Sequence, residues 1–478
     1  MRDLAGSGMN SGVTPVSAFP SHRRPRVLPV LFRVAALAYA TVRAGAVHAD
    51  TSTGGAAPLT FAHPIADLVY RRCSPCHREG QAAPFPLLTY ADLRKHAGTI
   101  PEVLEKGLMP PWLPDAAAGT FEEERRLTET EAGWFRKWLA EGMPEGDPAK
   151  VPAPPRWESG WALGKPDLVA TAERPYVLGP EGEDVYRNLV IRVPLPRDRW
   201  IRAVEFVPGN ARVVHHAFIR VDTEGQARRV DGQDGQPGFD TMLSTVRMPT
   251  GQLLSWNPGA SPIVSPPGLA WSLPANADLV VEMHLNRTGK PEPVQPSVGL
   301  YFTDTAPTNT CQLFKLTSWS LDFPADAASM VVRDEIELPV PVDVLAVYPH
   351  AHFLCRRMHG YAVYPDGRTE TLLRIPRWDF NWQSAFRYAT PRRLPRGTKL
   401  RLEYTYDNST NNPANPNHPP KRVVYGPQSS DEMCELAFQV LVRDTNALPA
   451  LIQTATEHRK GLAEAGYGSR IDRDPNDA

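Results

Sequence analysis

The stretch Val213-Val214-His215-His216-Ala217-Phe218-Ile219 sets the expectation for the fold of most of the chain, because it is short and apolar like a buried strand. Runs of this kind, separated by turn residues, recur at residues 188–193, 213–221, 278–285, 342–347, 399–406 and 436–442. Many short strands with proline and glycine turns predict β-sandwiches rather than a parallel sheet with helices. This region is large for one sandwich, so we expect two, over residues 166–310 and 311–450.

The composition agrees with a β-rich, multidomain chain. Fifty prolines and 34 glycines in 478 residues argue against long helices, because proline removes a backbone donor and collects in loops and at strand edges. The length suggests three or so domains, and 42% apolar with 22% charged residues is ordinary for a soluble globular protein. A net charge of -1 gives no electrostatic case for binding nucleic acid or an anionic membrane surface.

The N-terminus is typical of an export signal. Residues 22–26 are basic, residues 27–42 are mostly apolar, and Val47-His48-Ala49 resembles a cleavage site. The alternative is a membrane anchor, but the apolar run is interrupted and shorter than the ~20 residues that a span needs. We therefore expect residues 1–49 to be a signal peptide, and the mature protein to be periplasmic or extracellular with no membrane span.

Residues 50–148 are expected to form a small all-α domain. Helices are predicted at residues 64–72, 89–106 and 128–141, the last beginning with a capping box between Thr128 and Glu131. Residues 149–165 are proline-rich and predict a linker. Residues 451–478 are expected to be a polar tail that begins as a helix.

The helical region contains the motif Cys73-Ser74-Pro75-Cys76-His77. Two cysteines separated by two residues can be a zinc or redox pair, but a histidine directly after them favours covalent haem attachment. The two thiols add to the porphyrin vinyl groups and the adjacent imidazole binds the iron. We expect one haem c, attached to Cys73 and Cys76 with His77 as proximal ligand.

The distal haem ligand is predicted to be Met109. It lies on a proline-stiffened loop ahead of the last helix, as in the small monohaem c-type cytochromes that this segment resembles. Met143 follows that helix, where a distal loop is not expected, and His63 and His96 are interpreted as surface histidines. A thioether ligand raises the haem potential, which suits an electron carrier.

The β-rich region supplies a second set of candidate metal ligands. His215 and His216 are successive on a strand, so both can reach one metal only at a sheet edge or a local distortion; otherwise one is buried and one exposed. In His350-Ala351-His352 the two rings share one strand face, about 6 to 7 Å apart. His284 alone would be an ordinary structural residue. Copper accepts imidazole and thioether ligands, which this set supplies together with Met433.

Taken together, His215-His216, Met283-His284, His350-x-His352 and the stretch Ser429-Ser430-Asp431-Glu432-Met433-Cys434 resemble the copper type II, ascorbate-dependent monooxygenase family. Residues 365–367, 378–383 and 406–409 look like those of bacterial members that carry a fused cytochrome. The resemblance implies two jelly-roll-like sandwiches that each hold one copper across a water-filled cleft. It implies that His215, His216 and His284 bind an electron-storing copper. His350, His352 and Met433 would bind the copper that activates dioxygen.

The function implied is hydroxylation of a C–H bond of a small-molecule substrate with dioxygen. The haem would receive electrons from a redox donor and pass them singly to the coppers, replacing or supplementing a reductant such as ascorbate. One competing hypothesis is a non-catalytic haem and copper protein for electron transfer or copper binding. Another is a reductase fed by the haem.

The sequence also departs from the family. Tyr348, Glu435 and Ala437 stand where the peptide-amidating enzyme has the residues that hold its peptide, which argues against a glycine-extended peptide as substrate. Cys311, Cys355 and Cys434 are odd in number, so at least one is unpaired. Export permits a disulfide bond between Cys434 and either of the other two.

Overall fold

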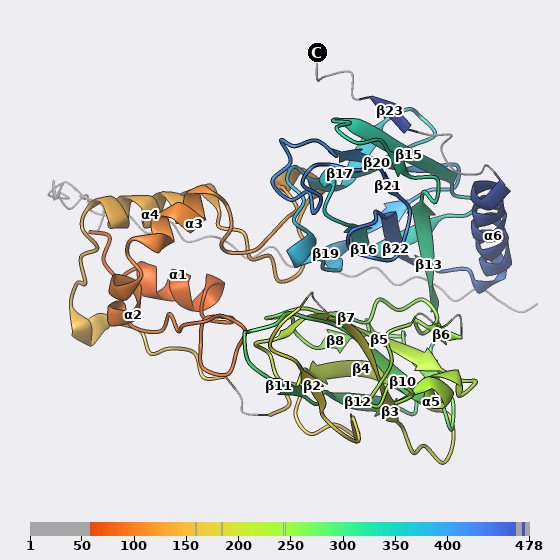
Figure 1. Cartoon of the computed structure of the whole chain (residues 1–478), viewed down its shortest axis with the longest axis horizontal. Helices are drawn as coiled ribbons and strands as arrows, with labels where there is room; N and C mark the ends of the chain where they lie inside the picture. Colours follow the sequence, from red (N-terminus) through yellow and green to blue (C-terminus); the bar gives the residue numbers. More distant parts are fainter. Residues whose placement is uncertain are drawn as a thin grey trace, which may run out of the picture. The chain divides into compact units, whose positions relative to one another are not determined.

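The structure is a computed structural model that describes residues 58–464 and 471–473, apart from residues 158–159, 183–184, 242 and 244. The predicted signal peptide, residues 1–49, lies outside the described residues. Strands make up most of the regular secondary structure of the described chain, and the longer helices occur before residue 141 and after residue 447 (Figure 1). None of the described helices is long and apolar enough to cross a membrane.

The first part of the chain is helical, as expected. Its elements are α1 (Ile65–Arg72), α2 (Tyr90–Lys95), α3 (Thr99–Glu105), η1 (Ala116–Ala118), α4 (Glu129–Ala140) and η2 (Pro148–Lys150). The predicted capping box is present at α4, where the Thr128 and Glu131 side chains each accept the other's backbone N–H. The prediction of a single helix over residues 89–106 is wrong, because α2 ends at Lys95 and α3 starts after Gly98, a residue type that weakens helix interiors.

Residues 111–122, here called the finger segment, leave the helices and join the second sandwich. The Phe121 ring stacks on Tyr388 at 4.9 Å between centroids, and Trp112 meets Phe386 edge to face at 5.3 Å. The Asp115 carboxylate forms an ion pair with Arg374 at 2.5 Å. The finger segment therefore belongs to the core of the second sandwich, although the sequence assigned it to the helical domain.

The first sandwich has two antiparallel sheets. One contains β1 (Leu168–Thr171), β12 (Ser297–Thr303), β4 (Arg199–Val207), β8 (Ile263–Val264) and β9 (Trp271–Leu273). The other contains β3 (Val185–Arg192), β10 (Asp278–Leu285), β5 (Val214–Asp222), β6 (Val246–Arg247) and β7 (Ser255–Trp256). A smaller pair, β2 (Tyr176–Leu178) with β11 (Glu292–Val294), and helix α5 (Gln226–Val230) complete it. Apolar side chains from both sheets form one core.

The second sandwich repeats this arrangement. One sheet has the order β13 (Thr310–Thr317), β22 (Cys434–Val442), β16 (Val342–Ala351), β19 (Phe386–Leu394). The other has the order β18 (Thr369–Ile375), β17 (Cys355–Val363), β20 (Lys399–Tyr406), β15 (Met330–Glu337), β23 (Ile471–Arg473). The short pair β14 (Asp322–Phe323) with β21 (Val423–Val424), η3 (Phe380–Trp382) and η4 (Thr445–Ala447) lie outside these sheets. The β-sandwich prediction is thus confirmed.

The C-terminal helix α6 (Leu448–Glu464) is not simply a polar tail. Leu451 is buried in the core of the second sandwich, and His458 lies 2.9 Å from the buried carboxylate of Asp334. The helix therefore packs on the sandwich.

Candidate functional site

The first candidate metal group forms at a β-bulge. In the pairing of β5 with β10, His284 faces His216, but the next residue, Leu285, faces Val214. His215 is therefore the extra residue of the bulge. Val214 and Ala217 both point into the core, so the two residues between them are free to share the opposite face. The bulge is the kind of local distortion that two successive strand histidines need in order to reach one metal.

The three histidines of this group converge. One nitrogen from each of His215, His216 and His284 lies within 4.8 Å of the others. The Nδ1 atoms of His215 and His216 are 3.1 Å apart. The ring of Tyr186, on the neighbouring strand β3, stacks on His284 at 4.5 Å with an interplanar angle of 3°. The donor set and its spacing fit one metal ion held by three imidazoles.

The second candidate group follows from simple strand alternation. Ala351 faces the core from β16, so His350 lies on the opposite face. The rings of His350 and His352 are 5.2 Å apart. Met433 directly precedes β22, and its Sδ is 3.2 Å from His350 Nε2. The structure therefore brings together the imidazoles and the thioether that the sequence predicted.

Hydrogen bonds orient the two imidazoles of the second group. His350 Nδ1 lies 2.5 Å from Gln383 Oε1, an acceptor, and His352 Nδ1 lies 3.1 Å from the carbonyl oxygen of Asp431. Each Nδ1 therefore carries the proton, which leaves both Nε2 atoms as lone-pair donors. This arrangement suits metal ligation at Nε2, beside the Met433 sulfur.

Glu432 connects the two chain segments that carry the second group. Its side chain is fully buried and accepts the backbone N–H groups of Met433 and Leu354, both at 2.8 Å, and that of His352. Burial raises the pKa of this carboxyl to about 8, against the lowering effect of the backbone N–H groups. Because its bonds reach residues on both segments, Glu432 fixes the distance between His352 and Met433.

Burial keeps His216, His350 and His352 in the neutral form that binds metal. It lowers the pKa of His352 to about 3, with the nearby His350 as the next cause. Burial also lowers the pKa of His350, and lowers that of His216 well below its usual value. Metal ions therefore compete little with protons at these rings near neutral pH.

Aromatic side chains connect the two groups. The Phe380 ring is 6.0 Å from His284 and 5.7 Å from His352. A second series of contacts runs from His216 to Phe218 at 5.7 Å, to Tyr348 at 5.5 Å, and to His350 at 6.4 Å. The resemblance implied a water-filled cleft here, whereas the described residues include rings that contact both groups.

Tyr348, Glu435 and Ala437, discussed above for their possible bearing on the substrate, lie beside the second group. In the pairing of β22 with β16, Glu435 lies opposite His350, and Ala437 lies opposite Tyr348. The Glu435 carboxylate is paired with Lys315 at 2.7 Å, which holds its pKa below the usual value despite burial. These side chains offer no cation for a peptide carboxylate.

The three cysteines of the β-region are buried and unpaired in this structure, so the predicted disulfide bond is not formed. Cys355 and Cys434 belong to one core cluster, and burial raises the pKa of both thiols well above the usual value. Cys311 lies in a different cluster. Cys355 is therefore better placed than Cys311 to partner Cys434.

The haem motif follows the end of α1. His77 Nδ1 lies 3.1 Å from the carbonyl oxygen of Phe85, so the proton is on Nδ1 and Nε2 is the free donor. Cys73 and Cys76 are partly exposed and unpaired. Two thiols and an imidazole with a free Nε2 fit covalent haem attachment.

The predicted distal ligand, Met109, is 36% exposed and lines a cavity of about 750 Å³ beside α3 and α4. His77 is not among the described residues that line this cavity. The structure thus places Met109 next to a space between helices, and its ligation of iron stays a prediction.

The haem motif contacts the first sandwich. Cys76 Sγ is 3.8 Å from the carbonyl oxygen of Pro258, which also accepts a hydrogen bond from Arg125 at 3.2 Å. Gly259 has a positive φ of 78°, and a Cβ there would lie 2.6 Å from Cys76 Sγ, so glycine permits this approach. The loop follows β7, which pairs with β5, the strand that carries His215 and His216.

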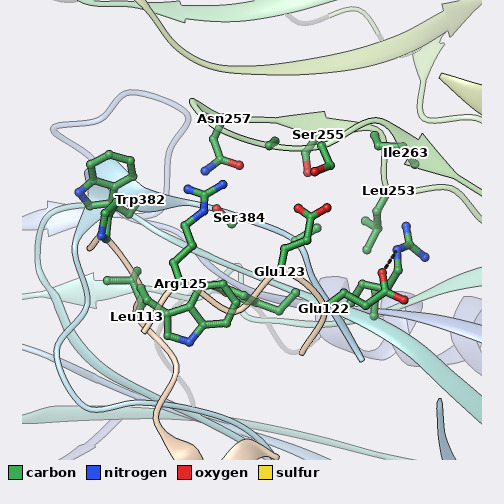
Figure 2. Close-up of a pocket in the computed structure, with 18 of the residues that line it drawn as sticks. Leu113, Glu122, Glu123, Arg125, Leu253, Ser255, Asn257, Ile263, Trp382 and Ser384 are labelled. Atoms are coloured by element: carbon green, nitrogen blue, oxygen red, sulfur yellow. Dashed lines mark ion pairs between the residues drawn. The ribbon is translucent and has the colours of Figure 1, made fainter. Parts of the chain in front are cut away.

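A small polar cavity of about 130 Å³ lies next to this loop. Figure 2 shows the Arg125 side chain directed toward Asn257, and Glu123 directed toward Ser255. Trp382 lines the same cavity, and its ring is 6.4 Å from His215. The cavity is therefore adjacent to the first histidine group.

Sequence reasoning did not single out Gln383, Glu432 or Phe380. Residues 378–383 and 429–434 were noted only as stretches that resemble the family. The signal for Glu432 was its position directly before a candidate ligand, Met433, and the apolar strand that follows, where an acid must find backbone donors. Phe380 and Gln383 lie on a loop, and no periodicity marks them.

Comparison with known proteins identifies no relative of known function. No protein-family model matches the chain, and no curated protein does. Among solved structures it is similar to the major capsid protein P2 of bacteriophage PM2, with 10% identity over 48% of this chain and 100% of that chain, at a TM-score of 0.18. It is also similar to the VP2 subviral particle of infectious bursal disease virus, with 9% identity over 59% of this chain and 73% of that chain, at a TM-score of 0.17. Scores this low carry no argument about this chain.

Proposed function

We propose that this protein is a copper-dependent monooxygenase that hydroxylates a C–H bond with dioxygen, and that electrons reach it through a covalently attached c-type haem. The main support is the pair of donor sets, a three-histidine group at a β-bulge and a His-His-Met group on the second sandwich. The contact of Phe380 with both groups supports their acting on one reaction. Such an enzyme is an oxidoreductase acting on paired donors.

In the proposed reaction one oxygen atom of dioxygen enters the C–H bond and the other leaves as water, which requires two electrons and two protons from outside the substrate. Bound copper supplies one-electron redox chemistry, and a soft thioether favours its reduced form. His215, His216 and His284 would hold the electron-storing ion, whereas His350, His352 and Met433 would hold the ion that binds dioxygen.

The surrounding residues orient these ligands and limit their access to water. Gln383 and Asp431 hold the Nδ1 protons of His350 and His352, so neither ring needs to rotate or lose a proton when a metal binds. The rings of Phe218, Tyr348 and Phe380 border the ligands, and apolar borders exclude water from a reactive oxygen species.

The haem motif is proposed as the entry point for electrons, from a redox donor that the sequence does not identify. Its support is the contact of Cys76 with the loop after β7, because β7 pairs with the strand that carries the first histidine group. Covalent haem attachment of this kind takes place outside the cytoplasm, which agrees with the proposed export to the periplasm or beyond.

Metal analysis of the exported protein, with a reduced-minus-oxidised spectrum, tests the cofactors. We expect one haem and two coppers per chain. A protein that holds only one copper, with His284 unligated, would contradict the two-copper assignment. Hydroxylation under ¹⁸O₂ separates the enzyme from a non-catalytic carrier or a reductase, because only a monooxygenase places labelled oxygen in its product.

Cys76→Ser tests the electron entry. It removes one thioether, so we expect stable haem attachment to be lost while both histidine groups keep their metals and the β-sandwiches stay folded. Activity with the physiological donor should fall, and activity with ascorbate should persist. Unchanged activity with the physiological donor alone would show that the haem is not the entry point.

A further inference from the structure

A large cavity in the second sandwich has an aromatic wall. It measures about 890 Å³, within the range of small-molecule binding sites. Five aromatic side chains line it: Phe353, Trp378, Phe380, Trp382 and, from the finger segment, Trp112. The Phe353 and Phe380 rings are 4.4 Å apart, and Trp378 and Phe380 are buried. A wall of this kind favours flat, apolar ligands, because rings stack on it and displace water.

The cavity borders both histidine groups through one residue. Phe380 lines the cavity, and its ring lies 5.7 Å from His352 and 6.0 Å from His284. Trp378 also lines it and donates its indole N–H to the backbone oxygen of His352 at 3.1 Å. The cavity therefore lies beside both histidine groups, with Phe380 in contact with each.

Positive charge lies at the same cavity. Arg356 and Arg377 line it, and among the described residues neither forms an ion pair. Arg356 Nη1 donates to the amide oxygen of Asn412 at 2.9 Å, and Arg377 donates to the carbonyl oxygen of Lys106. The one acid in the lining, Asp379, accepts the backbone and side-chain N–H groups of Asn381 at 2.9 and 3.0 Å.

This distribution of charge selects between ligands of similar shape. Two guanidinium groups without a carboxylate partner attract an anion, and arginine binds carboxylates through two parallel hydrogen bonds. A ligand with an ammonium group would instead meet like charge. The aromatic wall and the two arginines together favour an aromatic carboxylate over an aromatic amine or an uncharged hydrocarbon.

We infer that this cavity binds the substrate, and that the substrate class is small aromatic carboxylic acids. The inference rests on the proposed function. The ring stacks between the tryptophans, the carboxylate pairs with Arg356 or Arg377, and an alkyl C–H bond of the side chain faces Phe380 and His352. That bond is replaced by C–OH, and the second oxygen atom becomes water with two protons from solvent and two electrons from the reductant that feeds the haem.

Binding is tested on the full-length, metal-free protein by titration calorimetry. The probes are 3-phenylpropanoate and 3-phenylpropylamine, which share a skeleton and differ in charge. We expect the acid to bind about tenfold more tightly than the amine or better, the scale of one charge-assisted hydrogen bond. Equal binding of acid and amine, or binding of neither, would overturn the inference.

Substitution of each cavity arginine, with one matched control, locates the binding site. Arg356→Gln keeps a polar side chain that can still bond Asn412, and it should reduce the preference for the acid to about twofold or less. Arg422→Gln is the matched control, because Arg422 pairs with Asp322 on the same sandwich and does not line the cavity. It should leave both affinities unchanged. If Arg356→Gln and Arg377→Gln both keep the full preference, the carboxylate does not bind here.

Turnover separates this inference from the proposed function. With copper and ascorbate under ¹⁸O₂, the acid should yield a side-chain alcohol that contains one labelled atom. Tight binding that depends on Arg356, without labelled product under any condition, would retain the binding site and refute the monooxygenase. Labelled product whose formation is unaffected by Arg356→Gln and Arg377→Gln would support the monooxygenase and refute this cavity as its substrate site.

Discussion

The two sandwiches each present a group of candidate metal ligands on the sheet face opposite the core, but they place those ligands by different means. The first breaks strand alternation, since the bulge at His215 lets two successive histidines share one face. The second keeps alternation, with His350 and His352 on either side of a core residue, Ala351. Alternation can be inferred from a sequence, whereas a bulge has to be seen in the pairing of two strands.

The two groups also differ in what orients their rings. In the first, His284 stacks on Tyr186, and His215 and His216 lie against each other. In the second, hydrogen bonds from His350 and His352 hold the rings in one tautomer. We therefore expect loss of a ring contact to weaken the first group, and loss of a hydrogen-bond acceptor to weaken the second.

Met433→Ile should have the largest effect, because it removes the one sulfur donor of the second group. We expect hydroxylation to fall to background and the second copper to bind weakly, while haem content and the first copper are retained. The volume is nearly conserved, so unfolding in urea should show a loss of about 1 kcal/mol. Full activity, or loss of the haem signal instead, would contradict the assignment of Met433.

Met358→Ile is the matched control for that substitution. Met358 is buried in the core of the same sandwich and belongs to neither metal group. A similar loss of stability with normal copper content and activity would assign the effect of Met433→Ile to the missing sulfur rather than to repacking.

Glu432→Gln should have the next largest effect. Above its pKa of about 8 the Glu432 carboxyl is ionised and accepts with both oxygens, whereas the amide accepts with only one atom, so at such a pH its NH₂ group faces at least one of the backbone N–H groups. We expect the affinity of the second site for copper to fall by 10- to 100-fold, the usual scale for residues that orient metal ligands. Separate titration of the two sites with copper measures this.

A matched control for Glu432→Gln exists in the first sandwich. Glu205 is also buried and accepts the backbone N–H groups of Ala162 and Leu163, at 2.6 and 3.2 Å. Glu205→Gln should cost comparable stability and leave both copper affinities unchanged. If it lowers the affinity of the second site as much as Glu432→Gln does, the effect is general destabilisation.

Much of the β-architecture could be predicted from the sequence. The expected strands at residues 278–285 and 399–406 match β10 and β20, because both are apolar runs bounded by turns. The finger segment could not be predicted, since its contacts with Phe386 and Tyr388 join residues far apart in the chain. The break between α2 and α3 could be suspected from Gly98 alone, but a single glycine also occurs inside helices.

The candidate ligands themselves were all predicted, because histidine and methionine are rare enough to stand out in apolar runs. Their supporting residues were not. Gln383 is distant in sequence from His350, and only the fold brings its amide to Nδ1. Phe380 likewise contacts both groups from a loop, and nothing in its local sequence indicates this.

Acidification should lower the free energy of unfolding of the metal-free protein, and the titration of His352 should account for part of this loss. Its pKa in the folded state is about 3, below the usual value of about 6.5. Between these two pH values the unfolded chain binds a proton that the folded chain does not, so stability falls as the pH is lowered through this window. One proton corresponds to a slope of at most about 1.4 kcal/mol per pH unit.

Urea unfolding of the metal-free protein at pH 7, 6 and 5 measures this contribution. His352→Gln should lose less stability than the wild type over the same range, because glutamine does not titrate. The difference between the two proteins isolates His352 from the carboxyl groups that also titrate on acidification. Parallel pH profiles would show that the pKa of His352 is the same in the folded and unfolded protein.

Tyr186→Leu should have the smallest effect and tests what orients the first group. The substitution removes the ring that stacks on His284 but keeps an apolar side chain. A stacked pair contributes about 0.5 to 1.5 kcal/mol, so copper affinity at the first site should fall by roughly 2- to 13-fold. Tyr186→Phe keeps the ring and should stay near wild type. If Tyr186→Phe lowers the copper affinity of the first site as much as Tyr186→Leu does, the hydroxyl rather than the stacking supports His284. In that case ring contacts do not orient the first group.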